Sequence, residues 1–416
     1  MSRNVQSTSA SRDRLRMKER RVLYVTAFVR ATTTSLVGVL LGVYLARLDI
    51  TGAAFGAILS AGLAGAALAA LVATFAGDQL GRRRFLMTLT LLSIGGTVAF
   101  AFSRSAVALG VAAFVGMLNG MGKDRGAALV LEQAALPSTT TAANRTQAIA
   151  WYTMVQDLGH AAGAALAGLP TLLSPSSELQ NAAPHRALLL ACAALGLVTL
   201  ALYARLGPTV DSPAANGRVA ITQRSRAILT KISALFAIDS LAGGFLTTAM
   251  LAYFFFERFG MAEGVIGALF FGARLMNAAS HLGAAWLARR IGLVNTMVFT
   301  HIPSSLLLVT VAFAPSFAVA SVLFLLREGL VEMDVPTRQS YVLAVVAPEE
   351  RTFASGVTNL VRLSAWAVAP AFAGLLMKGD SMVVPLVVGA AMKISYDLLL
   401  WRAFRGMRPP EEEPGR

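Results

Sequence analysis

Apolar residues dominate this chain in long runs that are separated by short polar segments. Twelve runs approach or exceed the roughly 20 residues that a helix needs to cross the hydrocarbon core of a bilayer. Each is predicted to be a membrane-spanning helix, because such a helix satisfies its own backbone hydrogen bonds. The predicted spans are 22–46, 52–76, 84–103, 106–136, 146–171, 186–206, 228–256, 262–289, 294–314, 316–346, 351–377 and 382–404.

Composition agrees with a protein that lies in a lipid bilayer. Hydrophobic residues make up 56% of the chain, charged residues only 14%, and the mean hydropathy is +0.64. Soluble domains carry about 25% charged residues. Pattern and composition together predict an all-α integral membrane protein.

Fixed positive charge is unevenly distributed between the two sets of loops. With the N-terminus in the cytoplasm, 23 Lys and Arg residues in the loops and at the ends of the spans lie on the cytoplasmic side and 5 on the other. This bias places both termini in the cytoplasm, and the cell (plasma or inner) membrane is the expected location. The net charge of +14 is then a topology signal that requires no nucleic-acid partner.

The second half of the chain repeats features of the first. Arg145-Thr146 before one apolar run recurs as Arg351-Thr352 before another, and small residues follow in both runs. Two pseudo-symmetric six-helix halves are therefore predicted, joined by a polar linker. The predicted parts are a cytoplasmic tail 1–21, a first half 22–206, a linker 207–227, a second half 228–405 and a cytoplasmic tail 406–416.

Several classes of chemistry lack the residues that they need. Cys192 is the only cysteine, which excludes an internal disulfide and a thiolate metal site, and neither a metal nor a cofactor is expected. No Gly-x-x-x-x-Gly-Lys-Ser/Thr loop occurs, so ATP hydrolysis is not expected. No nucleophile and base stand at the spacing of an enzyme's active site. Ion gradients remain as a source of energy.

Two motifs carry a family resemblance. After the second span stands a loop signature of an acid, a glycine and two arginines: Asp78, Gly81, Arg82 and Arg83. The fifth span holds a ladder of small residues: Gly159, Gly163 and Gly168. Thr74 replaces the first glycine of the signature, and Ala164 replaces the proline of the ladder. Over roughly residues 22 to 405 the chain resembles the major facilitator superfamily of secondary transporters.

The resemblance implies twelve helices in two six-helix halves around a central site. It also implies a cytoplasmic gate in which Asp78 faces the N-terminal end of the eleventh helix and the arginines bind nearby acids; Glu132 is assigned to this gate. The glycine ladder resembles a motif of antiporters. Small residues at four-residue spacing let helices approach closely, and Pro370 and Gly374 are expected to do the same in the eleventh span.

Sixteen charged residues fall inside the predicted spans. Exposing all of them to lipid would cost on the order of 40 kcal/mol, so they must pair or face a water-filled cavity. Lys393 and Asp397, four apart, are predicted to form a local ion pair, and Arg125 and Glu132 to share a face of the fourth span. The basic residues are Arg30, Lys123, Arg125, Arg274, Arg327, Arg338, Arg362 and Lys393, and the acidic ones are Asp124, Glu132, Asp157, Asp239, Glu328, Glu332, Asp334 and Asp397.

Buried acids and polar stripes provide the candidate site residues. The proton-coupling candidates are Asp239, Asp157, Asp124 and Glu328. The substrate-binding candidates are Arg30, Gln156, Arg274, Asn277, Asn359 and Arg362. Arg30 and Asp239 occupy nearly matching places in the two halves, so a static bridge between them and a working site are both open.

The sequence predicts a secondary active transporter that moves a small organic solute by alternating access. Proton-coupled efflux is the preferred mode, with protons, the solute and the lipid bilayer as partners and a monomer as the working unit. Uptake or exchange of an anionic metabolite by symport is the alternative, with arginines as carboxylate or phosphate clamps. A receptor that binds ligand without transport is a third hypothesis.

Overall fold

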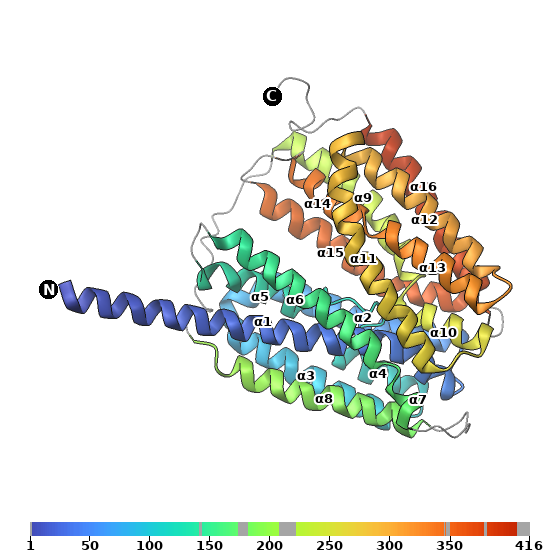
Figure 1. The fold of residues 1–416 in the computed structure, drawn as a ribbon, viewed down its shortest axis with the longest axis horizontal. Coiled ribbons are helices and arrows are strands. Elements are labelled where there is room, and N and C mark those ends of the chain that lie inside the picture. The colour runs from blue at the N-terminus through green and yellow to red at the C-terminus, as the bar shows by residue number, and fades with distance from the viewer. Residues whose placement is uncertain are drawn as a thin grey trace.

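The computed structural model describes residues 2–140, 144–173, 182–207, 222–344, 346, 350–377 and 381–405, which form two bundles of helices (Figure 1). The first bundle consists of α1 (Ser2–Arg47), α2 (Gly52–Leu80), α3 (Arg82–Phe102), α4 (Ala106–Gly116), α5 (Ala127–Ala135), η1 (Leu136–Thr139), α6 (Arg145–Leu166), α7 (Leu169–Leu173) and α8 (Ala183–Tyr203). The second consists of α9 (Gln223–Gly244), α10 (Thr248–Phe259), α11 (Glu263–Ile291), α12 (Leu293–Ala312), α13 (Phe317–Val331), α14 (Asp334–Ala344), α15 (Arg351–Leu376) and α16 (Val383–Phe404).

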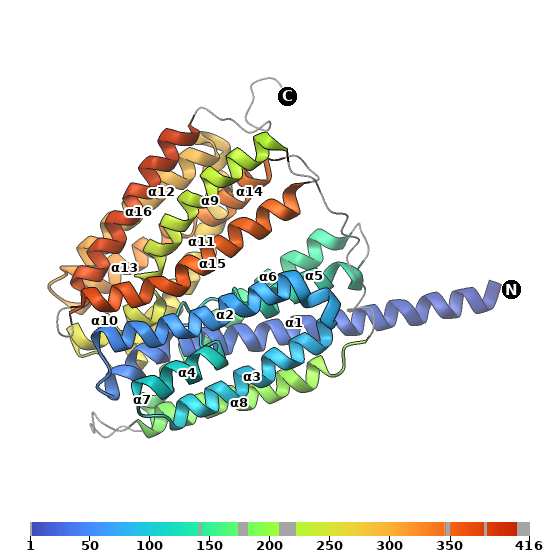
Figure 2. The same ribbon diagram turned by 180° about the vertical axis from the view of Figure 1, so that it is seen from behind.

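The two bundles lie at an angle, so that they meet at one end and diverge toward the other (Figures 1 and 2). The N-terminal end of α1 and the C-terminal end of α16 lie at the diverging end (Figure 1). The bundles contact each other most extensively through three helix pairs, α1 with α10, α2 with α15 and α6 with α11. Phe55 of α2 and Tyr253 of α10 pack across this contact with ring centroids 4.7 Å apart.

Small residues bring the helices of the two bundles close together. Gly56 of α2 lies against Gly374 of α15, where an added Cβ would stand 2.9 Å from the Gly374 Cα, and it also contacts the Pro370 carbonyl. Gly168, just after α6, lies against Gly264 of α11 with a corresponding distance of 2.8 Å. A larger side chain at these positions would push the bundles apart, since backbone cannot give way as a flexible side chain can.

Gly159 and Gly163 serve a contact within the first bundle. Gly159 of α6 lies against the Phe28 carbonyl of α1, where an added Cβ would stand 2.6 Å from the oxygen. One turn further along, Gly163 lies against Thr32 of the same helix. The ladder predicted from the sequence therefore faces α1 first and the second bundle only at Gly168.

Three predicted spans, the fourth, the seventh and the tenth, are broken well inside their length rather than continuous, and the fifth is interrupted near its end, between Leu166 and Leu169. The fourth divides into α4 and α5 around 117–126, where Met117 and Gly122 have positive φ angles of 52° and 65°. The seventh divides after Gly244, and Thr247 caps α10 by accepting a hydrogen bond from the Met250 N–H at 3.1 Å. The tenth divides at 332–333. Each break exposes backbone polar groups, which a membrane protein tolerates only where protein or a cavity surrounds them.

Nine stretches in the described part of the chain are long and apolar enough to cross a membrane. The three predicted spans outside this set correspond to α4 with α5, to α6, and to α13 with α14. Two of them are interrupted by breaks and all three carry polar or charged side chains.

The predicted tails and linker are described only in part. α1 begins at Ser2, so the helix of the first span continues back through the tail predicted for 1–21. Residues 208–221 of the predicted linker and 406–416 of the predicted C-terminal tail lie outside the described residues.

Candidate functional site

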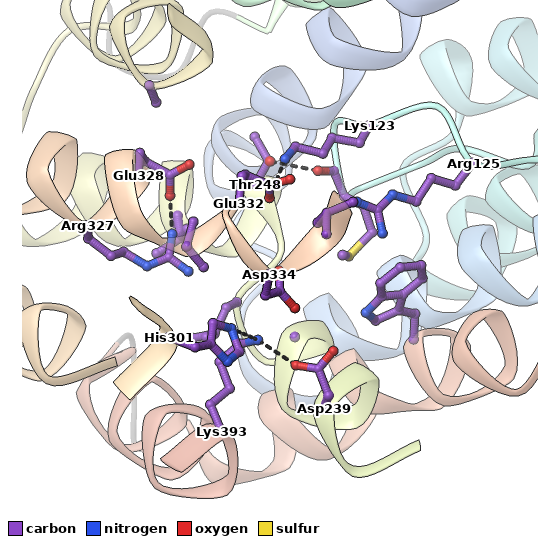
Figure 3. Close-up of a pocket in the computed structure, with 18 of the residues that line it drawn as sticks. Lys123, Arg125, Asp239, Thr248, His301, Arg327, Glu328, Glu332, Asp334 and Lys393 are labelled. Carbon is purple, nitrogen blue, oxygen red and sulfur yellow. Dashed lines mark hydrogen bonds and ion pairs between the residues drawn. The ribbon is translucent and has the colours of Figure 1, made fainter. Parts of the chain in front are cut away.

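A cavity of about 110 Å³ lies where the three broken spans come together (Figure 3). Its walls come from the break in the fourth span and from α9 to α16 of the second bundle. Seven lining residues are cationic and four are anionic, so the formal charge of the lining is +3, seven minus four, with His301 neutral. The cations are Lys123, Arg125, Arg274, Arg327, Arg338, Arg362 and Lys393, and the anions are Asp239, Glu328, Glu332 and Asp334.

Consecutive residues in the break of the fourth span bind different bundles. Lys123 Nζ lies 2.5 Å from the Glu332 carboxylate, which belongs to the break in the tenth span (Figure 3). Asp124 instead faces the first bundle, where its Oδ2 accepts a hydrogen bond from Arg30 Nε at 2.5 Å. Gln156 Nε2 donates to the same oxygen at 3.4 Å. The break therefore connects the charged groups of the first bundle with those of the second.

Arg30 belongs to a closed ion cluster inside the first bundle. Its Nη1 lies 2.8 Å from the Glu132 carboxylate, and its guanidinium donates to the hydroxyls of Tyr203 and Tyr152 at 2.9 and 3.1 Å. Both tyrosine hydroxyls donate in turn to Glu132 at 2.6 Å. Glu132 is fully buried, and α5 directs its carboxylate toward α1 and away from the two arginines of the loop signature; its role in a cytoplasmic gate stays a prediction. Arg30 faces a second cavity within the first bundle and does not line the central one.

Asp239 of α9 is surrounded by cations of its own bundle. Lys393 Nζ lies 2.9 Å from its carboxylate, Arg338 Nη1 3.1 Å and Arg362 Nη2 3.7 Å. The hypothesis of a bridge between Arg30 and Asp239 is therefore wrong, because each group is bound by residues of its own bundle. Asp239 is therefore not an isolated acid. Its several partners offset the cost of burying a carboxylate in the membrane.

A histidine lies between the two residues that were predicted to pair with each other. Lys393 Nζ lies 3.2 Å from His301 Nε2, and His301 Nδ1 lies 3.0 Å from Asp397 Oδ1. Lys393 and Asp397 share α16, but the direct ion pair predicted for them does not form because α12 brings His301 to both. Spacing along one helix could not reveal a partner on another.

Arg274 of α11 has no carboxylate within 4 Å among the residues that the structure describes. Its Nη2 donates to the Gly122 carbonyl at 3.0 Å and to Thr248 Oγ1 at 3.3 Å. Its Nε is buried and makes no hydrogen bond. Arg274 therefore lines the cavity as a buried cation with one unsatisfied donor.

Two arginines from different bundles contact one indole. The guanidinium carbon of Arg125 lies 4.8 Å from the centre of the Trp366 ring, and that of Arg362 lies 4.7 Å from it. Arg362 also donates from Nε to Ser240 Oγ at 3.1 Å. Arg125 pairs with no carboxylate in the described part of the chain. The break puts it outside α5, so it does not share a helical face with Glu132 as predicted.

The other candidates lie in varied surroundings. Asn277 Nδ2 donates to the Glu328 carboxylate at 2.7 Å, and Glu328 is also ion-paired with Arg327, so it is not an isolated proton carrier. Asp157 is half-buried on α6 and, within the described residues, makes no hydrogen bond or ion pair. Asn359 is exposed on α15 and does not line the central cavity. No group of three His, Cys, Asp or Glu side chains in the described ranges could hold a metal ion.

The loop signature lies at the end of α2. Gly81, with a φ of 80°, separates α2 from α3. Arg82 Nη1 donates to the Ala134 carbonyl at 3.2 Å, and Arg83 Nη2 donates to the Ala204 carbonyl at 2.6 Å. The side chain of Asp78 lies outside the described part of the structure. The two arginines thus reach the ends of other helices of the first bundle.

Comparisons with known proteins agree with this architecture. Residues 23–413 match the family model of the Major Facilitator Superfamily. An uncharacterized membrane protein of Saccharomyces cerevisiae is 24% identical over 421 residues, covering 93% of this chain and 94% of the yeast protein.

Solved structures share the fold at low sequence identity. The nucleoside transporter NupG has a TM-score of 0.71 at 13% identity, covering 94% of this chain and 99% of its own. A D-xylose-proton symporter gives 0.71 at 13% identity, covering 92% and 98%. The human organic anion transporter MFSD10 gives 0.59 at 17% identity, covering 92% and 99%. The family match spans most of the chain and confirms the predicted fold of twelve helices in two halves: the chain belongs to the Major Facilitator Superfamily of secondary transporters.

Proposed function

We propose that this protein transports a small organic anion by alternating access. The observation that carries the proposal is the excess of cations around the central cavity, seven against four anions. All four lining carboxylates already bind a cation, whereas Arg125 and Arg274 pair with none among the described residues. Burying an unpaired cation is expensive, and a bound anion would offset that cost. The guanidinium groups also have the planar donor geometry that carboxylates and phosphates prefer.

The contacts of Trp366 suggest how an anion would join the halves. Arg125 belongs to the first bundle, while Arg362 and Trp366 belong to α15 of the second. An anion bound by both arginines would hold the two bundles together at mid-membrane. Such a ligand favours the closed arrangement and promotes the change between the two open ones.

The charge of the cavity favours symport with protons over exchange for protons. An anion and a proton in one cavity neutralise each other, so each raises the affinity for the other. Exchange of a substrate for protons requires that the substrate and the proton exclude each other from the site. A cationic substrate meets this condition because it repels the proton. We therefore prefer proton-anion symport to the proton-coupled efflux suggested by the glycine ladder, since Gly159, Gly163 and Gly168 all have packing roles.

The arrangement of the bundles corresponds to an inward-open state under the topology that the loop charges predict. The bundles meet at the end opposite the start of α1 and the end of α16, where Arg47 of α1 and Glu263 of α11 form an ion pair. Thr171 Oγ1 donates to the same carboxylate at 3.2 Å. The predicted topology places both termini in the cytoplasm, and the predicted location is the plasma or inner membrane. The diverging end then faces the cytoplasm.

The known relatives support a transport function, but the substrate class is inferred from the cavity. The structural neighbours are named for nucleosides, D-xylose and organic anions, so one fold serves substrates of different charge. Fold alone therefore does not choose among them.

Counterflow in proteoliposomes tests the proposal. Vesicles containing the purified protein would be assayed with radiolabelled carboxylates and phosphate esters, and with neutral sugars and organic cations for comparison. We expect counterflow of at least one anion class, reduced in Arg125→Gln and unchanged in Arg104→Gln, because Arg104 is exposed outside the cavity. Counterflow of cations alone, unaffected by Arg125→Gln, would contradict the proposal and favour efflux.

A further inference from the structure

We infer that His301 is the proton-binding group that couples proton movement to anion transport, acting through Lys393 and Asp397. The inference rests on the proposed anion transport and deepens it. Four ionisable side chains form a continuous chain in the second bundle: Asp239, Lys393, His301 and Asp397. Figure 3 shows the first three of them. They come from α9, α16, α12 and α16 in that order.

The hydrogen-bond partners of His301 define its protonation state in this conformation. An ammonium group can only donate, so Lys393 Nζ donates to His301 Nε2 at 3.2 Å and that nitrogen carries no proton. Nδ1 then carries the proton and donates to Asp397 Oδ1 at 3.0 Å. His301 is therefore neutral while Lys393 contacts it. A proton on Nε2 would face the ammonium directly, so the imidazole can gain one only when Lys393 moves away.

An anion in the cavity supplies a reason for Lys393 to move. Asp239, His301 and Lys393 line the cavity, whereas Asp397 lies behind His301 and outside it. A carboxylate or phosphate near Arg362 would attract the Lys393 ammonium toward the cavity. Nε2 would then take one proton from cavity water, and Asp397 would remain hydrogen-bonded to the imidazolium. One anion and one proton would thus enter together.

The charge balance of the cluster agrees with this linkage. With His301 neutral, three anions and three cations cancel: Asp239, Asp334 and Asp397 against Arg338, Arg362 and Lys393. A proton on His301 adds one positive charge, which a monovalent anion neutralises. Four further ionisable groups on helices packed against α12 contact the imidazole ring or line the same cavity: Tyr396 of α16, whose ring centroid lies 6.2 Å from that of His301, Arg327 and Glu328 of α13, and Arg274 of α11. The helices packed against α12 also carry Tyr341, Arg402, Glu263, His281, Arg289 and Arg290, none of which lines this cavity.

The structure also distinguishes His301 from the other histidines. His160 Nε2 accepts a hydrogen bond from the Asp124 backbone N–H at 3.0 Å, which supports the break in the fourth span. His185 lies 3.3 Å from Glu263 where the bundles meet. His281 is half-buried on α11 and does not line the central cavity, so it offers a matched control.

The experiment separates anion movement from proton coupling. Proteoliposomes with an internal pH-sensitive dye would be assayed in two modes, anion counterflow at equal pH and anion uptake driven by an imposed pH gradient. In His301→Gln we expect gradient-driven accumulation and the accompanying proton flux to fall at least tenfold, with equal-pH counterflow within about threefold of wild type. His281→Gln should retain both.

Asp397→Asn provides an independent second variant. Without the carboxylate the imidazolium is less stable, so anion binding should require more acidic conditions than in wild type, and its pH profile should shift to lower pH. Retained gradient-driven accumulation in His301→Gln, or equal loss of counterflow and accumulation in that variant, would overturn the inference. Absence of anion counterflow in the wild-type protein would instead refute the proposed function on which the inference rests.

Discussion

Replacing Arg125 by glutamine should weaken anion binding and, at the same time, stabilise the empty protein. In the proposed site the guanidinium makes a charged hydrogen bond to the anion, which is worth about 1.5–3 kcal/mol. Its loss should raise the Kd for the anion by roughly 10- to 150-fold. Arg125 makes no ion pair within the described residues, and its contact with Trp366 at 4.8 Å contributes about 0.5–2 kcal/mol.

The predicted gain in stability follows from the cost of keeping this cation in the membrane. That cost is about 2.5–3.5 kcal/mol on insertion scales, which exceeds the contribution of the Trp366 contact by about 0.5–3 kcal/mol. With an unfolding entropy of about 2.1 cal/mol/K for each of 416 residues, the melting temperature should rise by about 1–3 °C. Opposite signs for affinity and stability are typical of a residue retained for function.

Two measurements on the purified protein check this prediction. Cys192 is the only cysteine and is buried, so a thiol-reactive fluorophore would report unfolding directly, while equilibrium binding of the radiolabelled anion gives the Kd. Arg125→Lys retains the charge without the planar guanidinium, so its Kd and melting temperature should lie between those of the wild type and Arg125→Gln. Arg104→Gln should change neither quantity. A lower melting temperature with an unchanged Kd would show that Arg125 is structural and refute the reasoning.

Two further predictions concern the contacts between helices. Glu263→Gln removes the ion pair where the bundles meet, so the contact should open more often. In a Cys192→Ser background, a cysteine introduced at the buried position Ala249 should then react faster with an impermeant maleimide. Unchanged reactivity would show that this pair does not hold the contact closed. Gly163→Ala places a methyl group against the α1 backbone and should lower stability by about 1–3 kcal/mol, seen as a lower denaturation temperature, whereas Gly110→Ala has open space and should be neutral. Equal effects of the two alanines would contradict the packing role.

The breaks in the helices show why the sequence pattern predicted the fold better than the site. A window average over the fourth span remains apolar although Lys123 and Arg125 stand within it, so the run reads as one helix. Gly122 adopts a positive φ angle there, and side chains of the second bundle bind the backbone beside it: Thr248 donates to the Met121 carbonyl and Arg274 to the Gly122 carbonyl. Such support comes from residues distant in the sequence, and no local pattern records it.

The sequence also could not predict which buried charges would pair with one another. Spacing of four residues suggested a bond between Lys393 and Asp397, but the structure inserts His301 from another helix. The internal repeat suggested Arg30 opposite Asp239, but each is bound within its own bundle. A pair of charges that are close in sequence, or matched by a repeat, still competes with every charge that folding brings nearer.

The sequence alone determined that this protein spans a membrane with twelve apolar segments, that its family is the Major Facilitator Superfamily, and that sixteen charges must avoid lipid. Those conclusions depend on hydrophobicity and spacing, which are summed along the chain. Tertiary structure alone decided which charges line the central cavity, which are neutralised elsewhere, and which arginines are left without a carboxylate. The physical reason is that charge pairing depends on distances of a few ångströms between helices, and only the packed bundle defines those distances.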